Sequence, residues 1–205
     1  MHIDFSPWAN QTVTPLEFSR SFTLDDLRAA TDTYLDTIRD LVQDFDDESL
    51  IFEPNDPKAK DEYAKTPEEV NMGWSLAHLV LHVTASLEEG AAISSLLARG
   101  VPVEGRFRYE PDWRDVTTSG QVLPRIEESR RMCQAYLDTW PDEPHLDIYR
   151  KFPPDSRLAN MQLNAPASYL FSLRHLSGHL DQFEDAAQQA RDTAHARLSG
   201  RAGKE

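Results

Sequence analysis

The sequence predicts an all-α protein, a single four-helix bundle with long connectors. Apolar residues recur at three- and four-residue spacing in four separate segments, a period typical of amphipathic helices. Proline-bearing stretches separate these segments, and 205 residues suffice for one domain with a substantial core. Antiparallel neighbours need only short turns, so the long connectors favour some parallel neighbours. We expect an irregular arm over residues 1–22, the bundle domain over 23–195 and a flexible tail over 196–205.

The first helix is expected to begin after Thr23. The arm before it carries prolines and no period, and Trp8 and Phe18 are expected to hold it against the bundle. Thr23 can cap the helix, acidic residues occupy the first turn, where the helix dipole favours them, and Phe22 can pack on Leu27. The buried stripe is expected to contain Leu24, Leu27, Thr31, Tyr34, Leu35, Ile38, Leu41, Val42 and Phe45.

The second helix is expected to be the central one. Prolines within residues 47–72 predict a long connector with at most a short helical turn. Ser75 can cap the apolar run that follows, and this run ends at Arg99 and Gly100. Its residues are apolar around much of the helix, which indicates burial on most sides.

The third helix is expected to begin near Pro124, after a crossing loop, and to stop at Pro141. Cys133 lies on its apolar stripe and is expected to be a core residue. Because it is the only cysteine, no intramolecular disulfide can form. A short extended segment at residues 146–149 is conceivable, but its alternation is too brief to predict a sheet.

The fourth helix is expected to run from Asn164, a capping residue, to about Ala194. Leucine, phenylalanine and alanine side chains form its apolar stripe. His175, His179 and Gln182 fall on the adjoining stripe, so their polar groups should lie beside the core. A helical bundle builds its sites at such positions.

The charge of the chain argues against several classes of partner. The formal net charge is -14 and the pI is about 4.8. Such a surface repels phosphate backbones and anionic lipid heads, so we expect neither nucleic acid nor a membrane as partner. The N-terminus lacks a basic and then apolar leader, and no run of about 18 apolar residues occurs. With a single cysteine, these features favour the cytoplasm.

Four of the seven histidines form two pairs at a spacing of four residues, His78 with His82 and His175 with His179. On a helix this spacing places both rings on one face, about one turn apart. Neutral imidazole is a ligand for zinc, nickel, copper and iron. The pair on the fourth helix and one histidine from the second would make a three-nitrogen site with an open side for substrate. A metal there would lower the pKa of a water to roughly 7 or hold a thiolate nucleophile.

Plainer interpretations remain for individual residues. A single His-x-x-x-His pair can arise by chance, but two pairs beside apolar stripes make chance less plausible. Gln182 could hydrogen-bond a ligand histidine, although a satisfied structural amide is the more ordinary role. Arg106 and Arg174 could hold an anionic substrate, although exposed arginines usually have no such role. The sequence contains no matched Glu-x-x-His motifs, which makes a carboxylate-rich di-iron bundle a poor alternative.

Two segments resemble signatures of the DinB/YfiT-like superfamily. Trp74-Ser75-Leu76-Ala77-His78-Leu79-Val80-Leu81-His82 resembles its second-helix signature, in which a tryptophan and a small hydroxyl residue precede a ligand histidine eight positions on. His175-Leu176-Ser177-Gly178-His179-Leu180-Asp181-Gln182 resembles its fourth-helix signature, His-x-x-x-His followed by Gln. The two motifs stand in the family's order, and the resemblance covers roughly Leu24 to Ala194.

The resemblance implies an up-down-down-up bundle with a divalent metal, zinc or nickel, on His82, His175 and His179. It also implies a metal-dependent enzyme, transferase-like, that activates a low-molecular-weight thiol such as mycothiol or bacillithiol, or water, for attack on a small electrophile. The alternative is a non-catalytic, stress-associated metal-binding or interaction protein, with a homodimer as its assembly. His78 departs from the family, and we expect it to support a ligand or to line the pocket rather than to be a fourth ligand.

Overall fold

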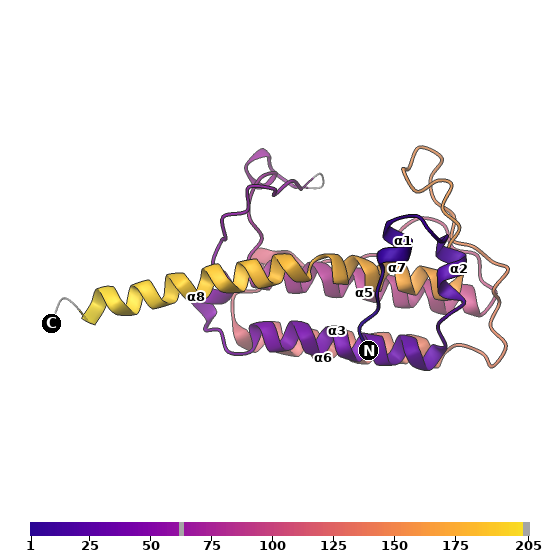
Figure 1. The fold of residues 1–205 in the computed structure, drawn as a ribbon, viewed down its shortest axis with the longest axis horizontal. Coiled ribbons are helices and arrows are strands. Elements are labelled where there is room, and N and C mark those ends of the chain that lie inside the picture. The colour runs from indigo at the N-terminus through magenta and orange to yellow at the C-terminus, as the bar shows by residue number, and fades with distance from the viewer. Residues whose placement is uncertain (62–63, 203–205) are drawn as a thin grey trace.

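The computed structural model describes residues 1–61 and 64–202, and within them every regular element is helical (Figure 1). An isolated bridge between Glu104 and Lys151 is the one β-type pairing in this part of the chain. The helices are α1 (Ser6–Ala9), α2 (Pro15–Ser19), α3 (Leu24–Val42), α4 (Asp47–Leu50), η1 (Pro67–Glu69), α5 (Leu76–Ala98), η2 (Trp113–Asp115), α6 (Ser119–Asp138), α7 (Ala165–Gly178) and α8 (Leu180–Ala202). The expected all-α class is confirmed.

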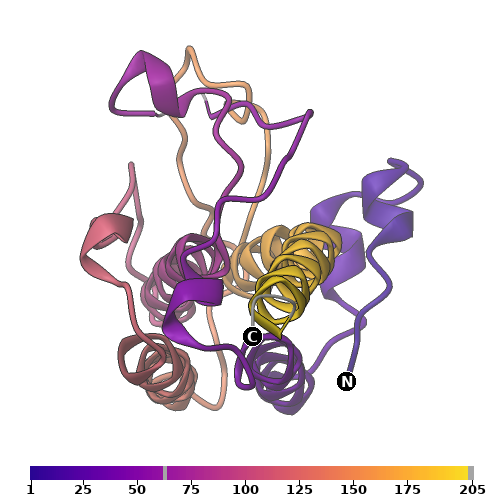
Figure 2. The ribbon, with the colours of Figure 1, turned by 90° about the vertical axis from the view of Figure 1, so that its left-hand side faces the viewer.

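Four long helical segments, namely α3, α5, α6 and α7 with its continuation α8, pack side by side (Figure 2). Helix α5 contacts α6 and α7, and α3 contacts both of these from the other side. The four segments therefore enclose a common core, in which each amphipathic helix buries its apolar face. In the described part of the chain, no helix is long and apolar enough to cross a membrane.

Local capping sets the start of three of these segments where the sequence predicts it. Thr23 Oγ1 accepts from Asp26 N–H at 3.2 Å, and Asp26 accepts from Thr23 N–H at 2.8 Å, which makes a capping box. Ser75 Oγ accepts from the backbone of His78 at 3.3 Å, and Asn164 Oδ1 accepts from the backbone of Ala167 at 3.2 Å. These bonds satisfy backbone donors that the first helical turn leaves unpaired.

Helix α6 begins five residues earlier than the expected start at Pro124. Gln121 Oε1 accepts from the backbone of Thr118 at 3.2 Å and from its hydroxyl at 3.0 Å, so a polar cap forms upstream of the proline. Pro124 then lies in the second turn, where its missing N–H costs a single helical bond. Cys133 is fully buried, as expected.

The predicted fourth helix is interrupted at His179, so it forms α7 and α8. The backbone N–H of His179 bonds to Leu176 O at 3.0 Å, a tight three-residue turn, and Phe183 N–H bonds to His179 O at 3.0 Å. Gly178, a poor helix former, immediately precedes the break. The helix reaches Ala202 rather than Ala194, so most of the predicted flexible tail is helical, and residues 203–205 lie outside the described residues.

The N-terminal arm is more regular than expected, because it contains α1 and α2. A capping box between Thr14 and Glu17, with Pro15 in the first turn, accounts for α2. Trp8 and Phe18 are buried, with ring centroids 5.8 Å apart, and attach the arm to the bundle as predicted.

The three long connectors lie on the side of α5 and α7 that carries the histidines, because residues of all three line one cavity together with His78, His82 and His175. Helices α5 and α7 approach closely, since a Cβ added at Gly90 would overlap the Ser172 hydroxyl. Buried apolar side chains fix the α5 side of the contact, for example Leu79 and Val83. This close, rigid pair of helices is the platform of the site described next.

Candidate metal centre

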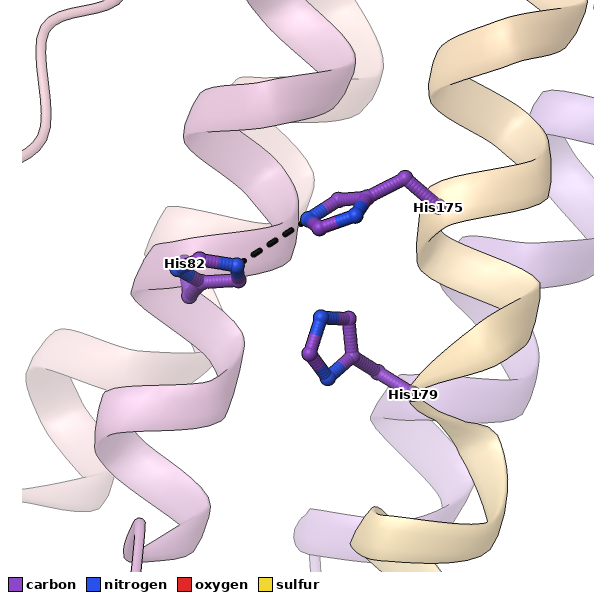
Figure 3. A group of neighbouring side chains, drawn as sticks. All are labelled: His82, His175 and His179. Carbon is purple, nitrogen blue, oxygen red and sulfur yellow. Dashed lines mark hydrogen bonds between the residues drawn. The ribbon is translucent and has the colours of Figure 1, made fainter. Parts of the chain in front are cut away.

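His82 lies on α5, His175 on the last turn of α7 and His179 at the break between α7 and α8. Figure 3 shows the three rings pointing toward one another from the two helices. One nitrogen from each ring lies within 4.8 Å of the other two. His82 Nε2 and His175 Nε2 are 3.0 Å apart. Among the described residues, this is the one group of three or more His, Cys, Asp or Glu side chains that could hold a metal ion.

The spacing of these nitrogens suits a divalent ion. Zinc–imidazole bonds are about 2.0–2.1 Å long, so two tetrahedral nitrogens lie about 3.4 Å apart. The observed spread from 3.0 Å to the limit of 4.8 Å brackets that separation. Small side-chain rotations would therefore bring all three nitrogens to one ion.

The protonation states of His175 and His179 also fit. Burial, with the neighbouring charges of His179 and His82, lowers the pKa of His175 from 6.5 to about 3. Burial likewise lowers the pKa of His179, although the hydrogen bond that this ring donates to Gln182 raises it. Both rings are therefore neutral near pH 7, the form that binds metals.

Gln182 orients His179. Its Oε1 lies 2.8 Å from His179 Nδ1, and an amide oxygen can only accept, so this nitrogen carries the proton. The lone pair of His179 is then on Nε2. Gln182 Nε2 in turn donates to Asp56 Oδ2 at 3.4 Å, which links the ring to the connector after α4. The predicted hydrogen bond between Gln182 and a histidine of the cluster is present, with the histidine as donor.

Glu110 and Arg108, on the connector between α5 and α6, flank the other side of His82. Glu110 Oε1 is 3.5 Å and Arg108 Nη2 is 2.8 Å from His82 Nδ1. A guanidinium only donates, so the Arg108 contact is made to an unprotonated Nδ1, whereas the Glu110 carboxylate can only accept a proton from Nδ1. Ligation of a metal through Nε2 requires the tautomer whose Nδ1 proton faces Glu110. Burial raises the pKa of Glu110, but the hydrogen bond from His82 and the charge of Arg108 hold it below its ordinary value. The sequence offered no signal for these two residues, because the loop has no period.

His78 does not belong to the three-histidine cluster. Its ring is stacked between Trp74, with centroids 4.5 Å apart, and Trp113, at 5.1 Å. Burial lowers its pKa from 6.5 to about 4, and its Nδ1 has no hydrogen-bond partner. Trp74 also contacts the rings of His82 and His179, at 4.5 and 5.9 Å. This tryptophan therefore joins His78 to the cluster by packing.

A cavity of about 880 Å³ opens beside the cluster, large enough for a small organic substrate. His78, His82 and His175 lie in its wall, and all three connectors contribute to it. Arg106 lines this cavity, whereas Arg174 lies over the Trp8 ring 5.6 Å away. A reacting atom bound at the histidines would thus meet a preformed space for the rest of its molecule.

Comparison with known proteins agrees with this arrangement. A search of curated proteins gave no match, and a search of solved structures gave none either. The family model of the DinB superfamily matches residues 23–183, a span that includes α3, α5, α6, α7, the first residues of α8 and all three clustered histidines. The chain therefore belongs to the DinB superfamily.

Proposed function

We propose that the protein binds one divalent metal ion, zinc or nickel, through His82, His175 and His179. We further propose that it is a metal-dependent enzyme in which a low-molecular-weight thiol or water attacks a small electrophile. The observation that carries the proposal is the convergence of three imidazole nitrogens at the wall of a substrate-sized cavity. Three protein ligands with an open side are typical of catalytic rather than structural metal sites.

A bound divalent ion would supply Lewis acidity, which lowers the pKa of a water or thiol at the open position. The residues of the chain do the rest. Gln182 accepts the Nδ1 proton of His179, which leaves the Nε2 lone pair of that ring for a metal. In the metal-bound form, Glu110 would accept the Nδ1 proton of His82 in the same way. Trp74 packs against the His82 ring, and the connectors form the other walls of the cavity beside it.

We also propose the family's up-down-down-up order for the four long segments. Its support is the length of the connectors between α3 and α5, between α5 and α6 and between α6 and α7, which are too long for tight antiparallel turns. In Figure 1 the connector between α5 and α6 returns along the bundle, as a parallel pair requires. In this order α5 and α7 run antiparallel.

Cobalt-loaded protein offers a direct test of the proposal, because a thiolate bound to Co²⁺ gives a characteristic charge-transfer absorption. We expect one Co²⁺ per chain and a new band when thiols are added. We also expect conjugation of chlorodinitrobenzene by the zinc or nickel form in the presence of a thiol. His175→Ala should abolish all three signals, while His145→Ala, which removes an exposed ring elsewhere, should retain them.

The outcomes separate the two functional readings. Metal binding without any thiol band, and without turnover of thiol- or water-dependent substrates, would favour the non-catalytic metal-binding protein over the enzyme. Failure to bind any divalent metal would refute both.

A further inference from the structure

Two arginines share one carboxylate at the end of the cavity away from His78. Glu89 of α5 is buried, and its side chain accepts from Arg106 Nη2 at 3.2 Å and from the backbone of Phe107 at 2.9 Å. Arg150 Nη2 lies 3.6 Å from the same carboxylate. All three side chains line the cavity. Two guanidinium groups against one carboxylate leave a net charge of about +1, in a chain whose net charge is -14.

The hydrogen bonds of this group are also incomplete. The Arg150 side chain is only 7% exposed, and its Nε has no hydrogen-bond partner. Its Nη2 donates to Gly105 O at 3.1 Å. Arg106 is by contrast 56% exposed, so part of its guanidinium remains available to a molecule in the cavity. Buried, under-satisfied charged donors are costly unless a further acceptor is supplied.

The group lies at a defined distance from the histidines. Glu89 follows His82 by seven residues, two helical turns, which places it about 10 Å farther along α5. Between them, Ser86 of α5 and Ser172 of α7 line the same cavity. The cavity therefore runs from the metal ligands past two hydroxyl groups to the paired arginines.

We propose that Arg106 and Arg150 bind the carboxylate of a substrate or thiol whose reacting atom lies at the histidine cluster, about 10 Å away. This inference rests on the proposed function for the identity of the reacting end. A single excess positive charge suits a monoanionic carboxylate better than a dianionic phosphate. The two serines would accept or donate hydrogen bonds along the chain between the two ends.

The carboxylate subsite is tested first without metal. Calorimetry of the full chain compares octanoate with octanol, the neutral probe. Octanoate should bind with a dissociation constant at least tenfold lower than that of octanol. Arg106→Gln should weaken octanoate binding by about tenfold to a hundredfold, as expected for a lost charge-assisted hydrogen bond. Arg131→Gln, which removes an exposed arginine of α6, should change nothing. Equal affinity for the two probes, or no effect of Arg106→Gln, would overturn the inference.

Glu89→Gln gives a change of opposite sign, which a merely structural role would not produce. Neutralising this carboxylate frees the two arginines, so octanoate should bind several-fold tighter. Arg106→Lys is the second variant, for use if Arg106→Gln does not fold. It keeps the positive charge and the ion pair with Glu89, so it should weaken octanoate binding less than Arg106→Gln does. Octanoate binding that is lost in both Glu89→Gln and Arg106→Lys would contradict the subsite.

Cobalt-loaded protein then tests whether one molecule occupies the histidine cluster and the carboxylate subsite together. The thiolate–cobalt band should reach half its maximum at a mercaptooctanoate concentration at least tenfold lower than the mercaptooctanol concentration needed. Arg106→Gln should remove this difference. If octanoate binds as predicted but no cobalt is taken up, the proposed function fails and the carboxylate subsite stands. If both thiols bind cobalt equally, the subsite fails and the proposed function stands.

Discussion

His78→Phe should make the protein markedly more resistant to acid. The imidazole is held neutral between Trp74 and Trp113, and burial lowers its pKa from 6.5 to about 4. In the unfolded chain its pKa returns to about 6.5, so the unfolded state binds the additional proton as the pH falls below that value. Stability is therefore lost between about pH 6.5 and about pH 4, the window set by the two pKa values.

The size of the effect follows from the same pKa values. Between about pH 7.5 and about pH 4.5, the proton bound only by the unfolded chain costs about 2.5 kcal/mol of folding free energy. Phenylalanine keeps a flat ring between the two tryptophans and loses no hydrogen bond at Nδ1, which has no partner. The variant should thus retain most of the neutral-pH stability and lose about 2.5 kcal/mol less on acidification.

Urea unfolding followed by circular dichroism, at several pH values and with a chelator present, measures this difference. His145→Phe is the matched control because that ring is exposed, and it should follow the parent protein. Parallel stability curves for His78→Phe and the parent protein would refute the reasoning, since the ring would then be as protonated in the folded protein as in the unfolded one.

Three further outcomes are expected. Glu110→Gln should weaken metal affinity by about tenfold to a hundredfold in a chelator competition, because the Nδ1 proton that His82 carries when Nε2 binds a metal loses its carboxylate acceptor. An effect equal to that of Glu104→Gln, an exposed control on the same loop, would count against this role. Gln182→Met should lower metal affinity similarly with little change in unfolding free energy, and unchanged affinity would argue that His179 needs no partner. Cys133, whose burial raises its pKa to about 12, should resist dithionitrobenzoate in the native protein and react when denatured; rapid native reaction would contradict the packing around α6.

The helices and the histidine pairs are predictable because each leaves a local pattern in the sequence, whereas the choice of His82 over His78 comes from the family resemblance. Capping residues such as Thr23 and Ser75 mark helix starts, and spacing by four residues places His175 and His179 on one face. The start of α6 was placed too late, because Pro124 resembles a first-turn proline while the cap at Thr118 acts upstream.

What could not be predicted depends on contacts between distant connectors. Glu110 reaches His82, and Trp113 covers His78, from a loop without periodicity. Loop conformation is set by tertiary contacts rather than by a repeating pattern, so sequence spacing gives no register for it. The break at His179 belongs to the same class, because a glycine inside a helical pattern ends some helices and is tolerated in others.

The central claim, a divalent metal on His82, His175 and His179, is tested most directly by the metal content of protein purified without a histidine tag. We expect one zinc or nickel ion per chain. We also expect its loss in alanine variants of each of these three histidines, with the helical circular dichroism retained, because other residues make the bundle core. Metal retained in all three variants, or no metal bound by the parent protein at saturating concentration, would contradict the account.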